Sequence, residues 1–200
     1  MTRPSDNDQY AVPARAARAE LRVRGSRFAA LVAPVEDESA VDARLAACRR
    51  THHDATHVAF AYRLRSGRYR ASDAREPAGT AGRPILALLD AAGLVDVLAV
   101  VARWFGGTKL GTAGLARAYA DAVRPALAAA GVETRYERET LEVACPLDRV
   151  ALVKRLVAPP HVALVAETFG ATARFTLAVR RSRVAEIEAR LAAARVDVRR

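Results

Sequence analysis

Apolar and polar residues alternate at every second position near the start of the chain, which is typical of a half-buried strand. The alternation covers residues 19–24, a turn follows at residues 25–26, and an apolar run returns over residues 27–33. This pattern predicts a β-hairpin. The preceding residues, 1–16, are polar and contain proline, so they predict a flexible N-terminal arm.

Strand-like and helix-like periods then alternate along the rest of the chain. Up to about residue 130, the pattern predicts a helix that begins after Asp37 or Ser39 and ends at Arg50, strands at 57–64 and 68–71, a loop at 72–83, a helix at 84–92, a strand at 96–105 and a long final helix. Residues 140–198 have their own order, strand, helix, two strands, helix and strand, which is the split pattern of a ferredoxin-like domain. We therefore expect an α+β protein with two domains, 17–134 and 135–200, after the arm.

Composition and charge narrow the class of protein. Hydrophobic residues make up 52% and charged residues 27% of the chain, as in folded globular proteins. The formal net charge of +10 favours polyanions such as RNA, the ribosome or anionic lipid. The excess of positive charge is spread along the chain, with 19 basic against 14 acidic groups in residues 1–134 and 13 against 8 in residues 135–200. Only Lys109 and Lys154 are lysines, a bias that GC-rich codon usage also produces.

The cysteines and histidines favour no metal or disulfide chemistry. Cys48 and Cys145 lie far apart, without the spacing of a disulfide framework or a metal site. Residues 52–57 contain three histidines and an aspartate, but a position between a helix and a strand favours hydrogen bonds to the backbone. We expect no cofactor and no metal. The N-terminus lacks the apolar run of a signal peptide, and no stretch is long enough to span a membrane, which predicts a cytoplasmic protein.

The segment that says most about function runs from the strand at 96–105 through a glycine-rich turn into a helix. Glycines allow close approach of the backbone, and the start of a helix presents N–H groups that bind anions. Lys109 is followed by Leu110, which excludes a Walker loop, and no dinucleotide-binding glycine spacing occurs. The alternative is a tight crossover that needs small residues for packing. The candidate phosphate- or nucleic-acid-binding residues are Arg103, Gly106, Gly107, Thr108, Lys109, Gly111, Gly114 and Arg117.

Another candidate site is the loop at residues 72–84, which we call the first loop because it precedes the glycine-rich turn, the second loop, along the chain. Its carboxylates, Asp73 and Glu76, can act as acid and base or bind a hard cation. The alternative, which we favour because no third carboxylate completes a site, is a structured turn. In that turn the carboxylates pair with Arg75 and Arg83 and cap the next helix. The candidates of this first loop are Ser72, Asp73, Glu76 and Thr80, with His57 from a neighbouring strand.

Both loops resemble the motifs of the IMPACT/YigZ family. The first loop matches in Ser72-Asp73, Glu76-Pro77 and the run Gly-Thr-Ala-Gly at 79–82, and the second matches through most positions of 103–119. Residues 25–28 and His57 with Ala61-Tyr62 extend the resemblance over nearly the whole first domain. The family usually has Ser-Asp-Asp-Gly-Glu-Pro where this chain has Ser-Asp-Ala-Arg-Glu-Pro at 72–77, a departure that removes a carboxylate and adds a cation.

The resemblance implies an N-terminal fold similar to the fourth domain of elongation factor G and a C-terminal fold similar to its fifth domain. It also implies a role in the regulation of translation. We expect a non-enzymatic protein whose partner is RNA or the ribosome, with a translation-associated protein as a further partner and no membrane. One alternative is a small enzyme that acts on a phosphorylated substrate at the loops Ser72–Pro84 and Gly106–Gly114. Another makes both loops structural and places partner binding on residues 136–200.

Overall fold

The computed structural model describes residues 8–158 and 160–200. It divides into two compact units, Ala11–Thr134 and Arg135–Arg200, the second of which also includes residues 8–10. Both units combine helices with strands, so the expected mixture of the two is confirmed. We describe each unit by itself.

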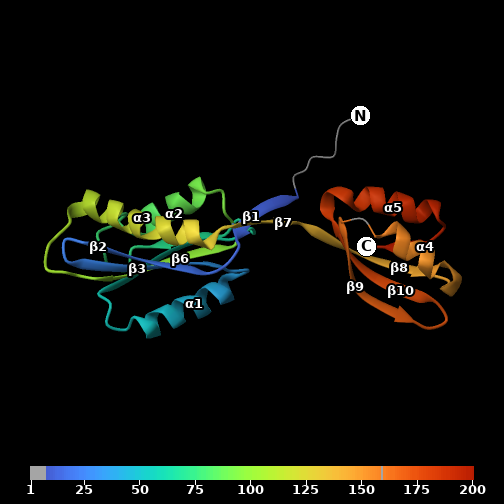
Figure 1. The fold of residues 1–200 in the computed structure, drawn as a ribbon, viewed down its shortest axis with the longest axis horizontal. Helices are drawn as coiled ribbons and strands as arrows, with labels where there is room; N and C mark the ends of the chain where they lie inside the picture. The colour runs from blue at the N-terminus through green and yellow to red at the C-terminus, as the bar shows by residue number, and fades with distance from the viewer. Residues whose placement is uncertain (1–7, 159) are drawn as a thin grey trace, which may run out of the picture. The chain divides into compact units, whose positions relative to one another are not determined.

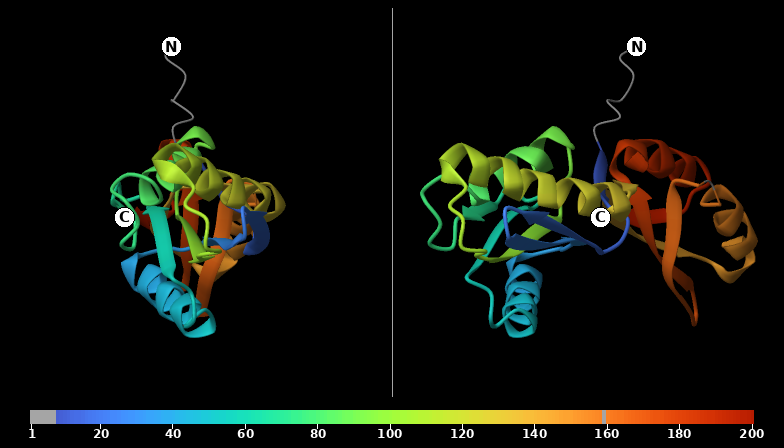
Figure 2. Two further views of the ribbon diagram at one scale, coloured as in Figure 1. Left: turned by 90° about the vertical axis from the view of Figure 1, so that its left-hand side faces the viewer. Right: turned by 60° about the vertical axis from the view of Figure 1, so that its left-hand side comes forward.

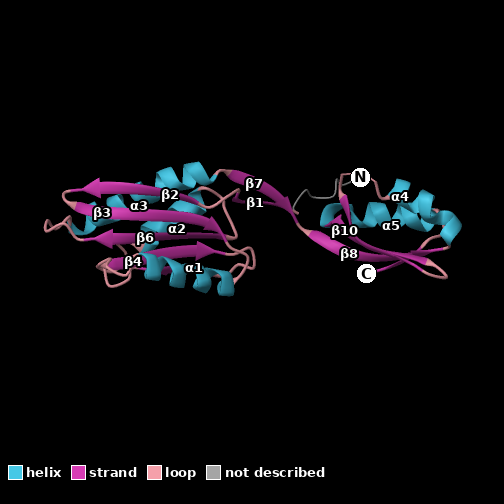
Figure 3. Ribbon diagram, turned by 60° about the horizontal axis from the view of Figure 1, so that its bottom comes forward, coloured by secondary structure: helices cyan, strands magenta, loops and turns pink. Residues whose placement is uncertain are grey.

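A five-stranded sheet forms the centre of the first unit, with the order β2-β3-β6-β4-β5 and antiparallel neighbours throughout (Figure 3). The strands are β2 (Ala17–Val23), β3 (Ser26–Pro34), β4 (His57–Arg63), β5 (Tyr69–Ser72) and β6 (Val97–Trp104). Helix α1 (Glu38–Thr51) covers one face, and α2 (Gly82–Ala91) and α3 (Gly111–Ala130) cover the other (Figure 1). The sheet is therefore the middle of three layers.

The burial pattern of the strands follows from these layers. Strand β6 is buried from Val97 to Arg103, because a central strand covered on both faces needs apolar side chains on both. One core cluster fills the side of α2 and α3, and another fills the side of α1. Strand β2 lies at the sheet edge and alternates between half-buried and exposed residues. Asp37 caps α1 by accepting a hydrogen bond from the N–H of Ala40 at 2.7 Å, which decides between the two expected capping residues.

The antiparallel pairing brings four loops to one end of this sheet. Strand β5 runs parallel to β6, since both are antiparallel to β4, so α2 and α3 both begin at the end where β6 ends. Strands β3 and β4 run against β6, so both start at this same end. We call it the loop end, formed by residues 24–26, 56–57, 73–81 and 105–110. It is the left-hand end in Figure 1.

The second unit has a four-stranded antiparallel sheet in the order β11-β8-β10-β9. Its elements are β8 (Arg138–Cys145), a 3₁₀ turn (Leu147–Arg149), α4 (Val150–Leu156), β9 (Val162–Phe169), β10 (Ala173–Arg180), a second 3₁₀ turn (Arg181–Arg183), α5 (Val184–Ala193) and β11 (Asp197–Arg199). Both helices cover one face of the sheet, where a single apolar core forms (Figure 2). The order of elements is the one expected for residues 140–198.

Two strands differ from the expectation. Residues 1–7 of the expected arm lie outside the described residues, but β1 (Gln9–Pro13) is a strand that pairs with β7 (Val132–Tyr136) in a two-stranded sheet. The N–H groups of Ala14 and Arg15 then bond to the carbonyls of Gly131 and Ala130. Pairing with a segment more than a hundred residues away orders a stretch whose own composition predicts no strand.

Candidate nucleic-acid interface

A buried ion pair lies beneath the loop end. Glu76 accepts a hydrogen bond from Arg103, with 2.5 Å between Oε1 and Nη1, and a second from the Tyr119 hydroxyl at 2.9 Å. The Nε2 atom of His57 is 3.8 Å from the same oxygen. Burial and the neighbouring Glu76 carboxylate both raise the pKa of Tyr119, so this hydroxyl stays protonated and donates. The cluster therefore holds a charged carboxylate in a closed set of donors.

Arg103 lies inside this cluster rather than at the surface. Its side chain is 5% exposed, and its Nη2 atom also donates to Ser26 Oγ at 3.3 Å. The rings of Phe28 and Phe105 lie 5.5 and 5.6 Å from the guanidinium carbon. An arginine paired and covered in this way is not available to an external phosphate, which removes it from the expected binding residues. Through Glu76 and Ser26 it instead joins the loop at residues 72–84 to the turn at residues 24–26.

Asp73 organises the first loop. Its carboxylate accepts hydrogen bonds from the N–H groups of Gly79, Ala81 and Gly82, at 2.8 to 2.9 Å. Burial alone raises the pKa of Asp73, but these three hydrogen bonds and the charge of Arg83 outweigh it and lower the pKa below its usual value. Because Ala81 is the N-cap residue of α2 and Gly82 its first residue, the carboxylate caps that helix, as the structured-turn alternative expected. Glu76 differs from that expectation because it pairs with Arg103.

The other polar candidates of the first loop bond within the loop. The Thr80 hydroxyl donates to the carbonyl of Pro77 at 2.7 Å, and Ser72 Oγ accepts from the N–H of Ala74 at 3.3 Å. His57 Nδ1 is 2.9 Å from the carbonyl oxygen of Ala74. These side chains therefore shape the backbone of residues 72–82. Among residues 8–158 and 160–200, no three His, Cys, Asp or Glu side chains gather closely enough to hold a metal ion.

Glycines at or beside the loop end are required by close backbone contact. A Cβ atom on Gly106 would overlap the backbone of Gly25 and Ser26, and one on Gly82 would overlap the backbone of Ser72. The N–H of Gly106 also donates to Ser26 Oγ at 3.2 Å. These glycines therefore act in packing, as the crossover alternative expected.

Other glycines face open space. Gly107 and Gly111 have φ values of +85° and +72°, with nothing near an added Cβ, and Gly114 meets only the Leu110 side chain. Helix α3 begins at Gly111 without a side-chain cap, without an acidic residue in its first turn, and with residues 105–109 and 111–113 exposed. Its first N–H groups therefore remain available to an anion at the surface.

Exposed cations lie at the loop end, two of them near this helix start in the sequence and one, Arg75, beside α1 and β4. Lys109, Arg117 and, from the first loop, Arg75 are exposed and make no hydrogen bond or ion pair in the part of the chain that the structure describes. Thr108 is exposed between Gly107 and Lys109. The loop end thus combines a buried, neutralised polar cluster with an open basic surface, an arrangement suited to holding phosphate groups.

Two members of the buried cluster, Ser26 and Tyr119, were absent from the expected site. Tyr119 is fully buried, and so is Ser26, although a serine in a turn and a tyrosine on a helix carry no separate signal of burial. Both lie within the stretches that resemble the family, 25–28 and 103–119. Their position within these motifs is the sequence feature that could have identified both residues as part of the site.

All residues of the candidate site lie within the part of the chain that resembles known proteins. A model of the Impact N-terminal domain matches residues 24–127. An IMPACT family member of Haemophilus influenzae is 33% identical over 178 residues, which cover 86% of this chain and 85% of that protein. A Thermus thermophilus protein named as an IMPACT family member in the pol 5' region is 40% identical over 140 residues, 70% of this chain and 76% of that protein. A crystal structure described as that of a hypothetical protein covers 96% of each chain, with 27% identity and a TM-score of 0.71.

The structure also bears on membrane association. Within the residues that it describes, no helix has the length and apolar character needed to cross a bilayer.

Proposed function

This chain belongs to the IMPACT family, and on that premise we propose that it is a non-enzymatic protein that binds RNA, on the ribosome or free, through the loop end. The observation that carries the proposal is a set of exposed cations without partners within residues 8–158 and 160–200. Lys109 and Arg117 stand on either side of the uncapped start of α3 in the sequence, and the first loop adds Arg75 at the same loop end. Anions bind at such helix starts because N–H groups point outward and the helix dipole favours negative charge.

The environments of the two carboxylates, Asp73 and Glu76, favour a binding role over acid–base catalysis. A general base must accept a proton, yet Asp73 already accepts three backbone hydrogen bonds and has a lowered pKa. Glu76 is 4% exposed and is held by Arg103 and Tyr119. Both carboxylates proposed for an acid–base enzyme therefore have structural partners, which makes that alternative the weaker one.

Regulation of translation is the role that the family resemblance implies, and we propose it here with a cytoplasmic location. The finer likenesses, to the fourth domain of elongation factor G for the first unit and to a ferredoxin-like fifth domain for the second, are part of the same proposal. The β-α-β-β-α-β order and the antiparallel β11-β8-β10-β9 sheet of the second unit support the latter.

Co-sedimentation with ribosomes and binding of labelled RNA across a salt series test the proposal. The double variant Lys109→Ala/Arg117→Ala is expected to bind RNA about tenfold more weakly, because each exposed ion pair that it removes is worth about 0.7 kcal/mol and the two together about 1.4 kcal/mol. The slope of log K against log salt also becomes shallower, by about 0.7 for each phosphate of a single strand that the protein no longer neutralises.

Arg124→Ala is the matched control, because Arg124 lies two helical turns from Arg117 on the same side of α3 and pairs with Asp121. Its RNA affinity should stay within about twofold of the wild type, since an exposed pair contributes little. Wild-type protein that binds neither RNA nor ribosomes at low salt would refute the proposal. Equal losses of affinity in the double variant and the control would remove the loop end as its site.

A further inference from the structure

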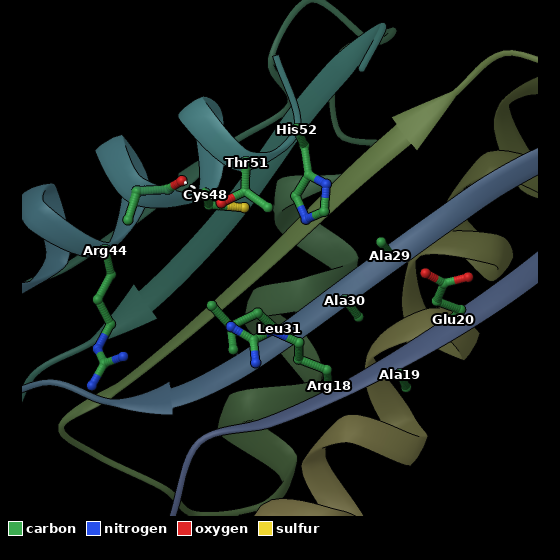
Figure 4. Close-up of a pocket in the computed structure, with 11 residues that line it drawn as sticks. Arg18, Ala19, Glu20, Ala29, Ala30, Leu31, Arg44, Cys48, Thr51 and His52 are labelled. Carbon is green, nitrogen blue, oxygen red and sulfur yellow. Dashed lines mark hydrogen bonds between the residues drawn. The ribbon is translucent and has the colours of Figure 1, made fainter. Parts of the chain in front are cut away.

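A groove lies on the face of the five-stranded sheet that carries α1 (Figure 4). Its volume is about 380 Å³, and it runs between α1 and the strands β2 and β3. Ala29 and Leu31 of β3 form its floor, while Arg18 on β2 and Arg44 on α1 approach it from opposite walls. His52 closes one end of the groove.

The groove exists because α1 covers only part of this face. The apolar side of α1, including Val41 and Leu45, packs on β4 and β6 in one core cluster. Strands β2 and β3 lie beyond the helix, and the exposed positions of β2 include Arg18, Glu20 and Arg22. Three polar side chains at every second position on an edge strand give this face a charged border in place of an apolar one.

A second hollow continues the groove toward the loop end. It has a volume of about 310 Å³ and is lined by residues that include Arg49, His53, His57 and Arg75. His52 lines both hollows, so they meet at this side chain. Together they form a path from Arg18 and Arg44 to Arg75, one of the cations proposed to bind RNA.

The charges along the path are mostly positive. Arg18, Arg44, Arg49 and Arg75 are exposed and make no hydrogen bond or ion pair within residues 8–158 and 160–200. The one carboxylate that lines either hollow in the described chain is Glu20, which lies 4.0 Å from the guanidinium of Arg27. The path is therefore complementary to a chain of negative charges.

We propose that this path holds a single strand of RNA that continues from the loop end, an inference that rests on the proposed function. A single strand exposes flat base faces as well as phosphates, and the path offers both an apolar floor at Ala29 and Leu31 and cations along its walls. His52 places an aromatic ring at the junction of the two hollows, and the ring of Trp104 lies edge to face with it at 5.3 Å between centroids. A duplex presents its phosphates outward and hides its base faces, so it gains nothing from the apolar floor.

The fluorescence of Trp104 reports on RNA binding in the path, because Trp104 is the one tryptophan of the chain and its ring contacts His52. Its fluorescence should change when an oligouridylate of about 12 nucleotides fills the path. The double variant Arg18→Ala/Arg44→Ala should bind this strand about tenfold more weakly, with a salt slope shallower by about 1.4. A blunt RNA duplex of equal length and polyglutamate are titrated in parallel, and both should bind more weakly than the single strand.

Arg50→Ala is the matched control, because Arg50 is equally exposed on α1 but lines neither hollow. Circular dichroism of each variant checks that it is folded. If Lys109→Ala/Arg117→Ala weakens binding and Arg18→Ala/Arg44→Ala does not, the path is wrong and the proposed function stands. If the wild type binds no RNA, the proposed function itself fails. Tighter binding of the duplex or of polyglutamate would overturn the choice of a single strand.

Discussion

The carboxylate of Glu76 and the guanidinium of Arg103 form an ion pair, 2.5 Å apart, whose side chains are 4% and 5% exposed. Removing one partner from such a pair leaves an unpaired buried charge, which costs far more than the pair itself contributes. The pair joins the first loop to the last residues of β6. It therefore links the stability of the first unit to the shape of the loop end.

Glu76→Gln is expected to destabilise the first unit by about 3 kcal/mol, because it leaves Arg103 buried without a countercharge. Urea unfolding followed by Trp104 fluorescence measures this directly, since Trp104 lies next to Arg103 in β6. The double variant Glu76→Gln/Arg103→Met removes both charges. Its destabilisation should be about 2 kcal/mol smaller than the sum of the two single variants. Additive effects would show that the two residues do not depend on each other.

The substitutions Gly106→Ala and Gly107→Ala test two different requirements for glycine in the second loop, close backbone packing at Gly106 and a positive φ at Gly107. A Cβ atom on Gly106 overlaps the backbone of Gly25 and Ser26, so the turns must move apart, and we expect a destabilisation of about 3 kcal/mol or more. Gly107 has a φ of +85° but open space, so its substitution costs only the backbone strain of about 1 kcal/mol. Thermal unfolding of both variants measures the difference. Equal destabilisation would contradict the close approach of the two turns.

The sequence predicted most of the regular structure of the chain. Strands and helices with a clear apolar period were found within a few residues of their observed bounds, and the apolar run 96–105 became the central strand β6. Strands β1 and β7 were missed because each depends on a partner far along the chain. Local periodicity carries no information about such a partner.

The candidate site was only partly predictable for the same reason. The two loops were identified from their glycines and charges, but spacing alone does not tell a surface arginine from a buried one. Arg103 follows a run of apolar residues, and only its pairing with Glu76, 27 positions earlier, makes burial of the charge tolerable. The capping role of Asp73 was foreseen as an alternative, since an acidic residue before a helix start often serves in that way.

Substitutions of Arg75 are expected to affect the stability of the first unit and RNA binding in opposite directions. Its φ is +70°, a conformation that favours glycine, and it stands where the family usually has glycine. Arg75→Gly should therefore stabilise the first unit by about 1 kcal/mol while it weakens RNA binding, because the loop end then carries one cation fewer. Thermal unfolding and RNA titration of the same sample measure the two effects.

Arg75→Ala is the matched control for this substitution, because it removes the same charge without the conformational freedom of glycine. It should weaken RNA binding to the same degree and leave the stability of the first unit nearly unchanged. If both variants bind RNA as the wild type does, Arg75 takes no part in binding. If Arg75→Gly is less stable than Arg75→Ala, the left-handed backbone at this position imposes no strain.

The lowered pKa of Asp8 indicates how the stability of the second unit depends on pH. Burial alone raises the pKa of this carboxyl, but hydrogen bonds from Arg180 and Ser182 outweigh it and lower the pKa from 3.8 to about 2. Because the folded pKa lies below the unfolded one, the stabilisation is complete above about pH 5 and is lost as the pH falls toward about 2. The shift corresponds to about 2 kcal/mol in the free energy of unfolding.

Asp8→Asn should therefore lower the stability of the second unit by about 2 kcal/mol at neutral pH, and the difference from the wild type should vanish near pH 2. Hydrogen exchange of the β10 amides measures this unit alone, since Trp104 reports on the first one. Asp197→Asn is the control, because Asp197 is exposed and lies 3.9 Å from the exposed Arg199, so its pH profile should match that of the wild type. An unchanged profile for Asp8→Asn would mean that the carboxyl is not held by Arg180 and Ser182 in solution.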